Sequence, residues 1–399
     1  MRDAFIKSHD NYEHYTQIVA DARGRPYTNK YSGDTTSMNR PALRAIAFCM
    51  VTILMLNFFN FIFWDDIHSL SRLTMKEMYE YDGNIDTVML GSSYVVHGFN
   101  PKVADEIFDG NSYNAGTKLQ AADGSYYMLK EFLKHHDVKT VYLDCNHVIM
   151  AQFTEPGFGM NSLISVYMKP SLDRLRFVYE SGGSDALIKN AFPFMIRKKL
   201  NFTDIVKAKL TDGYDDGNYH YVSFDEEKYI GNGFVQKEGH MKADDNYEPI
   251  WEINSSMPLT EFSLKYLEKI VELCKANDVR LVLMTVPVAS EMLNRIPNAQ
   301  DYVDAVQAFA DEHNVEYHNY NLARSKYCRI RLSDYSDKEH LNGTGADNFT
   351  RQFARTEKMI AAGEVSASDV FYSTLEEKLS GDADETADYY RYHKRPGAR

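Results

Sequence analysis

Two observations on this sequence predict an α/β fold with a mostly parallel sheet and helices on both of its faces. Short apolar runs alternate with longer segments whose apolar residues recur at helical spacing, from residue 85 to residue 361. Polar segments that could carry chemistry follow several of these apolar runs directly. Alternation of this kind is typical of parallel sheets, and such sheets bind their ligands outside the carboxyl ends of the strands.

The first half of the alternation ends at residue 144. Asn100 and Pro101 have the residue types of a helix cap and a first helical position. Residues 87–90 and 140–144 are apolar runs of strand length, and the region 119–135 has helical spacing. In order, we expect a strand at 87–90, a helix at 101–108, a short extended piece at 112–113, a helix at 119–135 and a strand at 140–144.

The second half resumes after residue 258. The run RLVLMTVPV at 280–288 is the strongest strand pattern in the chain, and apolar stripes at helical spacing lie on both sides of it. In order, we expect a helix at 262–276, a strand at 280–288, a helix at 301–313, an extended segment at 315–320 and a last helix at 345–361.

Residues 151–258 interrupt this rhythm and are interpreted as one large irregular insertion in the α/β domain. They are rich in aromatic residues, Gly and Asp and contain few clean periods. The insertion holds four tyrosines that either pack internally or stack on sugar rings: Tyr214, Tyr219, Tyr221 and Tyr229.

Residues 45–64 (AIAFCMVTILMLNFFNFIFW) contain no charged residue and are predicted to be one transmembrane helix. A cleaved signal peptide fits less well, because the leader is long, the apolar run exceeds a usual signal sequence and no small-x-small cleavage site follows. A buried soluble helix also fits less well, since the segment is apolar all round. Asn57 and Asn60 lie three residues apart, either as tolerated polarity or as a contact with another membrane helix.

The distribution of charge predicts the topology. Lys and Arg gather before the apolar segment, so residues 1–44 are expected to form a cytoplasmic tail and everything after residue 64 to lie outside. We then expect a neck at 65–84, an extracytoplasmic domain at 85–375 and a disordered acidic and basic tail at 376–399. The net charge of −13 argues against nucleic acid as a partner.

The four cysteines suggest neither a disulfide framework nor a zinc site. Cys49 lies in the apolar segment, and the other three are widely scattered. Cys145 and Cys274 lie in apolar runs and are expected to be buried thiols. No metal or cofactor site is expected.

Two short segments far apart in the sequence supply a nucleophile, a base and an orienting carboxylate. Ser93 follows the first apolar strand in Gly-Ser-Ser-Tyr, and Asp337 and His340 stand three residues apart before the last helix. Ser92 is an alternative nucleophile, and Asp334 is an alternative orienting residue. Each segment alone is weak, because Gly-Ser-Ser is common in turns and Asp-x-x-His could cap a helix.

Asn-Ala-Gly at 114–116 and Asp-Cys-Asn-His at 144–147 also follow extended segments. His97 and His147 would then flank the site, more simply as loop histidines lining the cleft than as substrate ligands. The order Gly-x-Ser, Asn-x-Gly, x-x-Asn and Asp-x-x-His resembles the four blocks of the SGNH/GDSL hydrolase superfamily, over residues 85–361 without the insertion.

The resemblance implies a three-layer, flavodoxin-like, doubly wound parallel sheet and a covalent acyl-serine mechanism. It implies that Ser93 is the nucleophile, that His340 is the base and that Asp337 orients it. Gly116 and Asn146 would donate N–H groups to the oxyanion. The sequence departs from the family pattern at Ser92, where Asp is usual, and in the third block.

Together with the membrane segment, these blocks look like a subset that includes the D-alanyl-lipoteichoic-acid transfer protein and alginate-type O-acetylation proteins. This likeness implies an esterase or acyltransferase that acts on acetyl or D-alanyl esters of a cell-surface glycan or teichoic acid. A membrane-bound O-acyltransferase would be its partner. The alternative is a non-catalytic envelope assembly protein that uses the same cleft to bind polymer or to scaffold a transferase.

Overall fold

The computed structural model describes residues 40–155, 157–196, 201–211, 213–217, 226–242, 252–293 and 295–381. Residues 1–55 and 56–399 are separate compact units. The predicted cytoplasmic tail lies outside the described residues up to residue 39. The C-terminal tail predicted at 376–399 lies outside the described residues from residue 382 onward. Its first residues, up to 381, are helical and not disordered as expected.

Helix α1 (Arg40–Phe63) contains the predicted membrane segment. It is long and apolar enough to cross a membrane, and none of its residues is buried by the protein. The helix begins at Arg40, five residues before the expected apolar segment, so it includes the flanking residues Arg40 to Arg44. The neck contains helix α2 (Ser71–Glu80).

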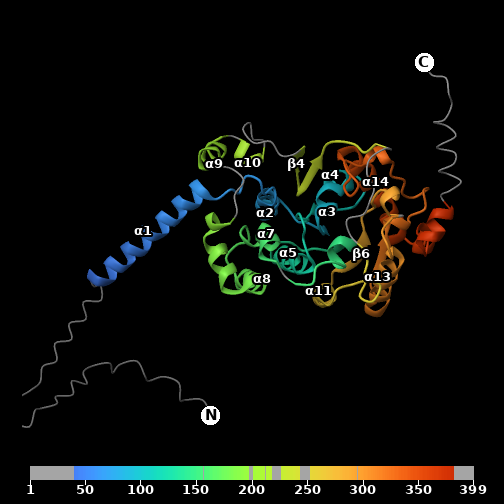
Figure 1. The fold of residues 1–399 in the computed structure, drawn as a ribbon, viewed down its shortest axis with the longest axis horizontal. Helices are drawn as coiled ribbons and strands as arrows, with labels where there is room; N and C mark the ends of the chain where they lie inside the picture. Colours follow the sequence, from blue (N-terminus) through green and yellow to red (C-terminus); the bar gives the residue numbers. More distant parts are fainter. Residues whose placement is uncertain are drawn as a thin grey trace, which may run out of the picture. The chain divides into compact units, whose positions relative to one another are not determined.

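The domain is built on a five-stranded sheet in which every strand is parallel to its neighbours (Figure 1). Its strands are β1 (Thr87–Leu90), β2 (Ser112–Asn114), β3 (Thr140–Asp144), β6 (Arg280–Thr285) and β7 (Glu316–Asn319). Their order, β2-β1-β3-β6-β7, is the flavodoxin-like doubly wound order, with its topological switch point between β1 and β3. The predicted fold class is confirmed.

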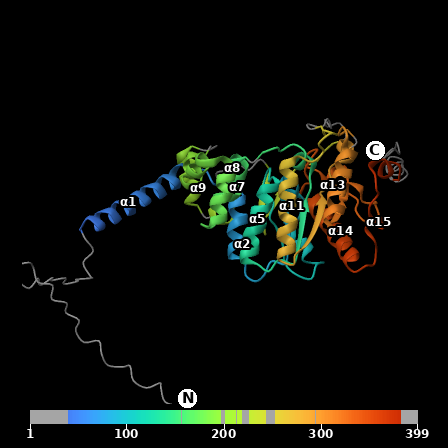
Figure 2. The ribbon, with the colours of Figure 1, turned by 90° about the horizontal axis from the view of Figure 1, so that it is seen from below.

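Helices cover both faces of the sheet. Figure 2 shows three of them side by side on one face: α5 (Ala122–His135), α11 (Glu261–Ala276) and α13 (Ala299–His313). The other face packs against α3 (Ser93–Gly98), α4 (Pro101–Ala104) and α14 (Gly343–Ala361). Alternate strand residues divide between the two cores, so Val141 and Leu143 face the first and Tyr142 faces the second.

The helix predicted from residue 119 begins three residues later, at Ala122. Leu119 has a left-handed backbone with φ +55°, which a continuous α-helix does not accept, and its side chain is half-exposed. The prediction from apolar spacing therefore counted Leu119, which belongs to the preceding loop, as part of the helix. The helix opened by Pro101 is likewise shorter than expected and ends at Ala104.

The insertion contains ordered elements that pack on the same domain. They are α7 (Phe158–Ser165), α8 (Leu172–Ala191), η1 (Pro193–Met195), α9 (Phe202–Lys209), α10 (Gly213–Asp216) and the antiparallel hairpin β4 (Glu227–Gly231) and β5 (Phe234–Lys237); the short helix α6 (His147–Met150) precedes the insertion. Phe177 of α8 stacks on Tyr127 of α5 with ring centroids 4.5 Å apart. The remaining short helices are α12 (Ser290–Leu293), η2 (Tyr320–Leu322), η3 (Leu332–Asp334) and α15 (Ala367–Val370).

Candidate active site

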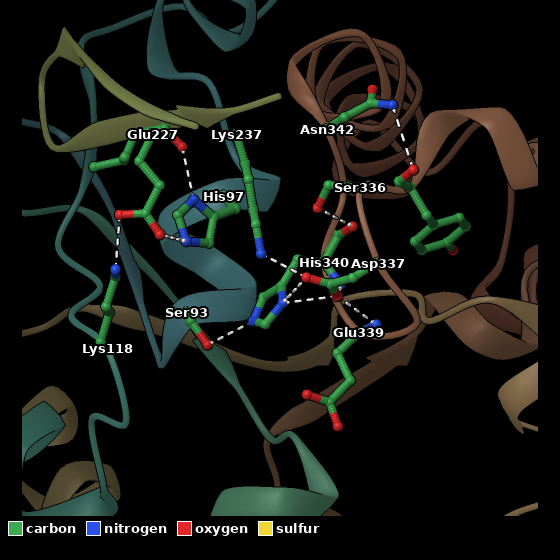
Figure 3. A network of polar contacts seen from close by, with 12 residues as sticks. Ser93, His97, Lys118, Glu227, Lys237, Ser336, Asp337, Glu339, His340 and Asn342 are labelled. Atoms are coloured by element: carbon green, nitrogen blue, oxygen red, sulfur yellow. Dashed lines mark hydrogen bonds and ion pairs between the residues drawn. The ribbon is translucent and has the colours of Figure 1, made fainter. Parts of the chain in front are cut away.

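Ser93 is the first residue of α3, two residues beyond the turn that ends β1. The turn needs glycine at position 91, because a Cβ there would lie 2.6 Å from the Val95 side chain and 2.7 Å from Cβ of Asp144. The Ser93 hydroxyl lies 2.9 Å from Nε2 of His340 (Figure 3). Ser92 is buried, and its hydroxyl has no hydrogen-bond partner among the described residues. The geometry thus places Ser93, and not Ser92, against the imidazole.

The loop before α14 holds the other two members of the predicted set. Nδ1 of His340 lies 2.9 Å from Oδ1 of Asp337, and that oxygen also accepts the backbone N–H groups of Glu339 and His340. A carboxylate can only accept, so Nδ1 carries the proton and Nε2 is left to accept from the Ser93 hydroxyl. Asp334, the alternative orienting residue, instead accepts the backbone N–H of Arg331.

Asp337 also pairs with a cation that comes from the insertion. Nζ of Lys237, at the end of β5, contacts Oδ2 of Asp337 (Figure 3). Burial alone would raise the pKa of Asp337, but the hydrogen bonds and charges of His340 and Lys237 outweigh it and hold that pKa well below its usual range. The orienting carboxylate is therefore ionised across the physiological pH range.

A second polar network lies beside the first. His97 of α3 is buried; its Nδ1 donates to the carbonyl of Val235 at 2.9 Å, and its Nε2 lies 3.4 Å from Glu227. Glu227 also pairs with Lys118 at 2.7 Å. Burial would raise the pKa of Glu227, but His97 and Lys118 lower it to about 2. The His97 ring is 5.4 Å from that of His340, so this network borders the loop that holds His340, and its Glu227 and Lys118 line a cavity together with Gly116.

The two predicted oxyanion donors differ in their state. The Gly116 N–H donates to Oδ1 of Asn114 at 3.1 Å, and Asn114 is itself held by the carbonyls of Val95 and Phe99. Asn146 follows β3, the strand next to β1, and its Oδ1 accepts the N–H of Val148 to cap α6. Its buried Nδ2 makes no hydrogen bond of ordinary geometry within the part of the chain that the structure describes, although Asn146 lies close enough to the Tyr94 hydroxyl to interact with it.

Buried acidic and phenolic groups lie close to these donors. Burial raises the pKa of Asp144 to about 7, even though its Oδ1 accepts the N–H of Val286 at 3.0 Å. Burial also raises the pKa of Tyr94, whose ring lies 5.3 Å from that of His340. Asp144 is the last residue of β3 and lies beside the turn at Gly91, so a carboxyl group of raised pKa stands next to that turn.

Two other polar residues singled out from the sequence, Tyr214 and Tyr229, have structural partners, whereas Nε2 of the buried His147 has none among the described residues. His147 lines a small, mostly apolar cavity with Tyr302 and Ile253, and burial lowers its pKa to about 4. Tyr214 donates to Asp66 at 2.7 Å and Tyr229 donates to Glu77 at 2.7 Å, which favours packing over sugar stacking for these two. Tyr219 and Tyr221 lie outside the described residues.

Sequence reasoning missed Lys237 and Glu227, both on the β4–β5 hairpin. One signal was available, because Asn232-Gly233 stands between the short apolar runs Tyr-Ile and Phe-Val, a pattern typical of a tight hairpin. The turn docks on the second block, since the backbone carbonyl of Asn232 accepts the N–H of Asn114 at 3.0 Å. The insertion is thus part of the site.

Comparisons with known proteins identify no family for this chain. No family model matches it, and no curated protein matches it. Among solved structures, it is similar to a GDSL-like lipase from Bacteroides thetaiotaomicron, with 12% identity, 74% of this chain and 99% of that chain covered, and a TM-score of 0.33. It is also similar to a protein described as a platelet activating factor from Streptococcus pneumonia, with 11% identity, 78% of this chain and 98% of that chain covered, and a TM-score of 0.35. A protein described as an acylhydrolase from Bacteroides fragilis shows 11% identity, 73% of this chain and 99% of that chain covered, and a TM-score of 0.33. Likenesses this distant carry no weight by themselves, so a function has to be inferred from the geometry of the site.

Proposed function

We propose that this chain is a membrane-anchored, extracytoplasmic serine esterase or acyltransferase of the SGNH/GDSL type. Its substrates would be acetyl or D-alanyl esters of a cell-surface polysaccharide or teichoic acid. One observation carries the proposal: Ser93, His340 and Asp337 form a continuous hydrogen-bonded relay at the β1–β3 switch point. Switch points are where doubly wound sheets bind their ligands.

The relay supports acyl transfer through a covalent serine intermediate. The Ser93 oxygen would attack the carbonyl carbon of the ester while its proton passes to Nε2 of His340. Asp337 would hold the resulting imidazolium through Nδ1. Collapse of the tetrahedral intermediate breaks the bond to the alcohol oxygen, which takes the proton from His340 and leaves Ser93 acylated. Water or a polymer hydroxyl then attacks the acyl-serine by the same route in reverse.

Asn146 is the best-placed donor for the negative charge that develops on the carbonyl oxygen. Its Nδ2 is a buried donor that makes no hydrogen bond of ordinary geometry among the described residues, and such a group stabilises an anion strongly where water is excluded. Gly116 would contribute only if an oxyanion displaced the Asn114 side chain from its N–H.

The location of the site is part of the proposal. The 24 residues of α1 make a helix about 36 Å long, enough to cross a bilayer. Arg40 and Arg44 at its start favour a cytoplasmic N-terminus, which would place the domain outside. A membrane-bound O-acyltransferase would be its partner in the same membrane. Single cysteines introduced within residues 1–44 and 376–399, treated with a membrane-impermeant thiol reagent in whole cells, test this orientation. Labelling of the N-terminal cysteine alone would overturn it.

A fluorophosphonate probe tests the catalytic proposal directly. The full chain in detergent should be labelled, and Ser93→Ala and His340→Ala should each abolish labelling. Ser92→Ala is the matched control and should retain it, because Ser92 does not contact His340. Intact mass after incubation with an activated acetyl ester should show one added acetyl group on the native chain. If the native chain shows no fluorophosphonate label and no acetyl adduct that depends on Ser93, the catalytic proposal is wrong.

The occupied Gly116 N–H favours one other candidate, a non-catalytic envelope protein that binds polymer in the same cleft. That protein would retain polymer on an affinity matrix equally well with and without the Ser93→Ala substitution, and it would form no adduct. An esterase or acyltransferase would form the adduct only with Ser93 in place.

A further inference from the structure

Exposed apolar side chains are concentrated on one part of the insertion. Outside α1, ten large apolar side chains are exposed among the described residues, and seven of them lie between residues 172 and 210. These seven are Leu172, Leu175, Tyr179, Ile188, Met195, Phe202 and Leu210, and they are called the apolar face below. A water-soluble surface rarely gathers large apolar groups in this way, so the concentration points to a partner.

The pattern on α9 is that of a helix with an outward apolar stripe. Phe202, Val206 and Leu210 stand at intervals of four residues, so they lie along one side of the helix. Phe202 is 53% exposed and Leu210 is 73% exposed, whereas Ile205 and Ala208 are buried against the protein. The helix therefore has apolar residues on both its inner and its outer side.

The first half of α8 repeats the pattern. Leu172, Leu175 and Tyr179 stand at i, i+3 and i+7, and their exposed fractions are 83%, 56% and 60%. Helices α8 and α9 lie at the same end of the domain in both views (Figures 1 and 2). Met195 of η1, which is half-exposed, lies between them in the chain.

This end of the domain is also where the candidate membrane helix enters it. Phe59 and Phe63, in the last turns of α1, contact Phe194 and Phe202 with ring centroids 6.0 and 6.3 Å apart. Oδ1 of Asn60 accepts the backbone N–H of Phe194 at 3.2 Å. The partner of Asn60 is therefore the insertion itself, and Phe202 of the apolar face touches the end of a helix suited to lipid.

Amphipathic residues surround the junction. Nζ of Lys209 donates to the carbonyl of Trp64 at 2.7 Å and lies 3.3 Å from Asp66. Trp64 stacks on Tyr167 with ring centroids 5.5 Å apart. Tryptophan and tyrosine are enriched where a membrane meets water, so Trp64 indicates the level of the lipid headgroups.

We propose that the apolar face lies on the lipid bilayer and that α9 and α8 rest in the interface with their outward stripes among the lipids. A lipid surface is favoured over a protein partner because the face adjoins the outer end of the membrane helix, where the bilayer is the first surface that it meets. Docking at this face holds the domain directly against the membrane.

Single-cysteine fluorescence in nanodiscs tests the contact with lipid. Cys49 is replaced by alanine in the full chain because it is the exposed native cysteine, whereas the other three are buried. A single new cysteine, Phe202→Cys or Leu210→Cys, is then labelled with the environment-sensitive dye NBD. The nanodiscs contain phosphatidylcholine and phosphatidylglycerol, with or without a lipid spin-labelled near the headgroup. Met257→Cys and Leu379→Cys are matched controls, because these apolar side chains are 37% and 44% exposed and lie outside the apolar face.

An interfacial helix buries its apolar side about 5–10 Å into the headgroup and acyl boundary, so the spin-labelled lipid should reduce NBD intensity at 202 and 210 by roughly half or more. The two controls should change little. With NBD at 210, adding Phe202→Glu should weaken the quenching, and the fold should survive because the side chain is exposed. Equal quenching at all four sites would overturn the proposal. A second result would also overturn it. If the spin-labelled lipid does not quench NBD at 202 and 210, but the NBD emission shifts to the blue as the number of chains per nanodisc rises, the apolar face joins copies of the chain.

Discussion

Replacing Lys237 with methionine tests whether the insertion hairpin tunes the catalytic base. Lys237 places a positive charge on Oδ2 of Asp337 while His340 binds Oδ1 of the same carboxylate. The two cations therefore share one counter-ion. Without Lys237 the whole carboxylate charge acts on the imidazole that receives the Ser93 proton, so the dependence of the Ser93 attack on pH should change.

The size of the effect follows from Coulomb's law. Lys237 and the imidazole contact the same Asp337 carboxylate, and two unit charges at such short range interact by about 1 kcal/mol in bulk water. The interaction is then about 0.7–1.4 kcal/mol, which corresponds to about 0.5–1 pH unit. The side chains of Lys237 and Asp337 are 21% and 38% exposed, so solvent screening keeps the effect in this range and no larger.

The assay is the rate of fluorophosphonate labelling of the full chain in detergent between pH 5 and pH 9. The pH of half-maximal labelling should rise by about 0.5–1 unit in Lys237→Met, and the plateau at high pH should change little. Lys237→Arg should restore the native midpoint. Lys228→Met is the matched control, because Lys228 is an exposed lysine of the same hairpin, outside the triad.

Two results would refute this reasoning. An unchanged midpoint with an unchanged plateau would mean that the lysine charge does not reach the imidazole. A uniform loss of rate at every pH would mean that Lys237 only holds the loop in place. Absence of labelling in the native chain would instead contradict the proposed esterase, and the two failures are therefore distinguishable.

Three further changes test the packing around the site. The raised pKa of Asp144 means that the folded state retains a proton that the unfolded chain loses near pH 4. Stability should therefore fall by roughly 1 kcal/mol per pH unit as pH rises from about 5 to 7, and Asp144→Asn should flatten this decline in chemical denaturation. Gly233→Ala would place a Cβ 1.7 Å from the carbonyl oxygen of Asn114, so the hairpin should detach, with slower labelling and faster proteolysis within 226–242; native resistance would contradict this. Asn342→Ala removes the cap of α14 and should lower the free energy of unfolding by about 1–2 kcal/mol, whereas an unchanged value would show that water replaces the cap.

The sheet and its rim could be predicted because they depend on local pattern. Three apolar residues and a threonine before Gly91 suffice to indicate a buried strand, and β1 occupies the same residues, 87–90. The chemistry-bearing residues follow such strands, and a parallel sheet brings their carboxyl ends to one edge. Ser93 and Asn146 each lie three residues beyond a strand position paired in register, Leu90 with Leu143, so they follow neighbouring strands at equivalent positions.

The contribution of the insertion could not be predicted, because it depends on contacts distant in sequence. Lys237 and Asp337 are 100 residues apart, and His97 and Val235 are 138 apart. No local period links such positions. An exposed lysine on a short hairpin has the same sequence pattern whether it faces solvent or an active-site carboxylate, so only the folded chain distinguishes Lys237 from Lys228.

The two oxyanion candidates show the same limit in another form. Sequence order assigns Gly116 and Asn146 equal roles, yet the Gly116 N–H is already satisfied by Asn114, while Nδ2 of Asn146 is buried without a hydrogen bond of ordinary geometry among the described residues. Leaving a buried donor unpaired costs about 1–3 kcal/mol, a cost that an oxyanion would offset at the moment of reaction. Asn146→Ala should therefore slow acylation of Ser93 by roughly 100-fold or more, in addition to the roughly 1 kcal/mol of stability that loss of its cap on α6 costs. Gly116 acts mainly by allowing its backbone to approach Gly91. A loss of stability with an unchanged rate of acylation would instead leave Asn146 with the structural role alone.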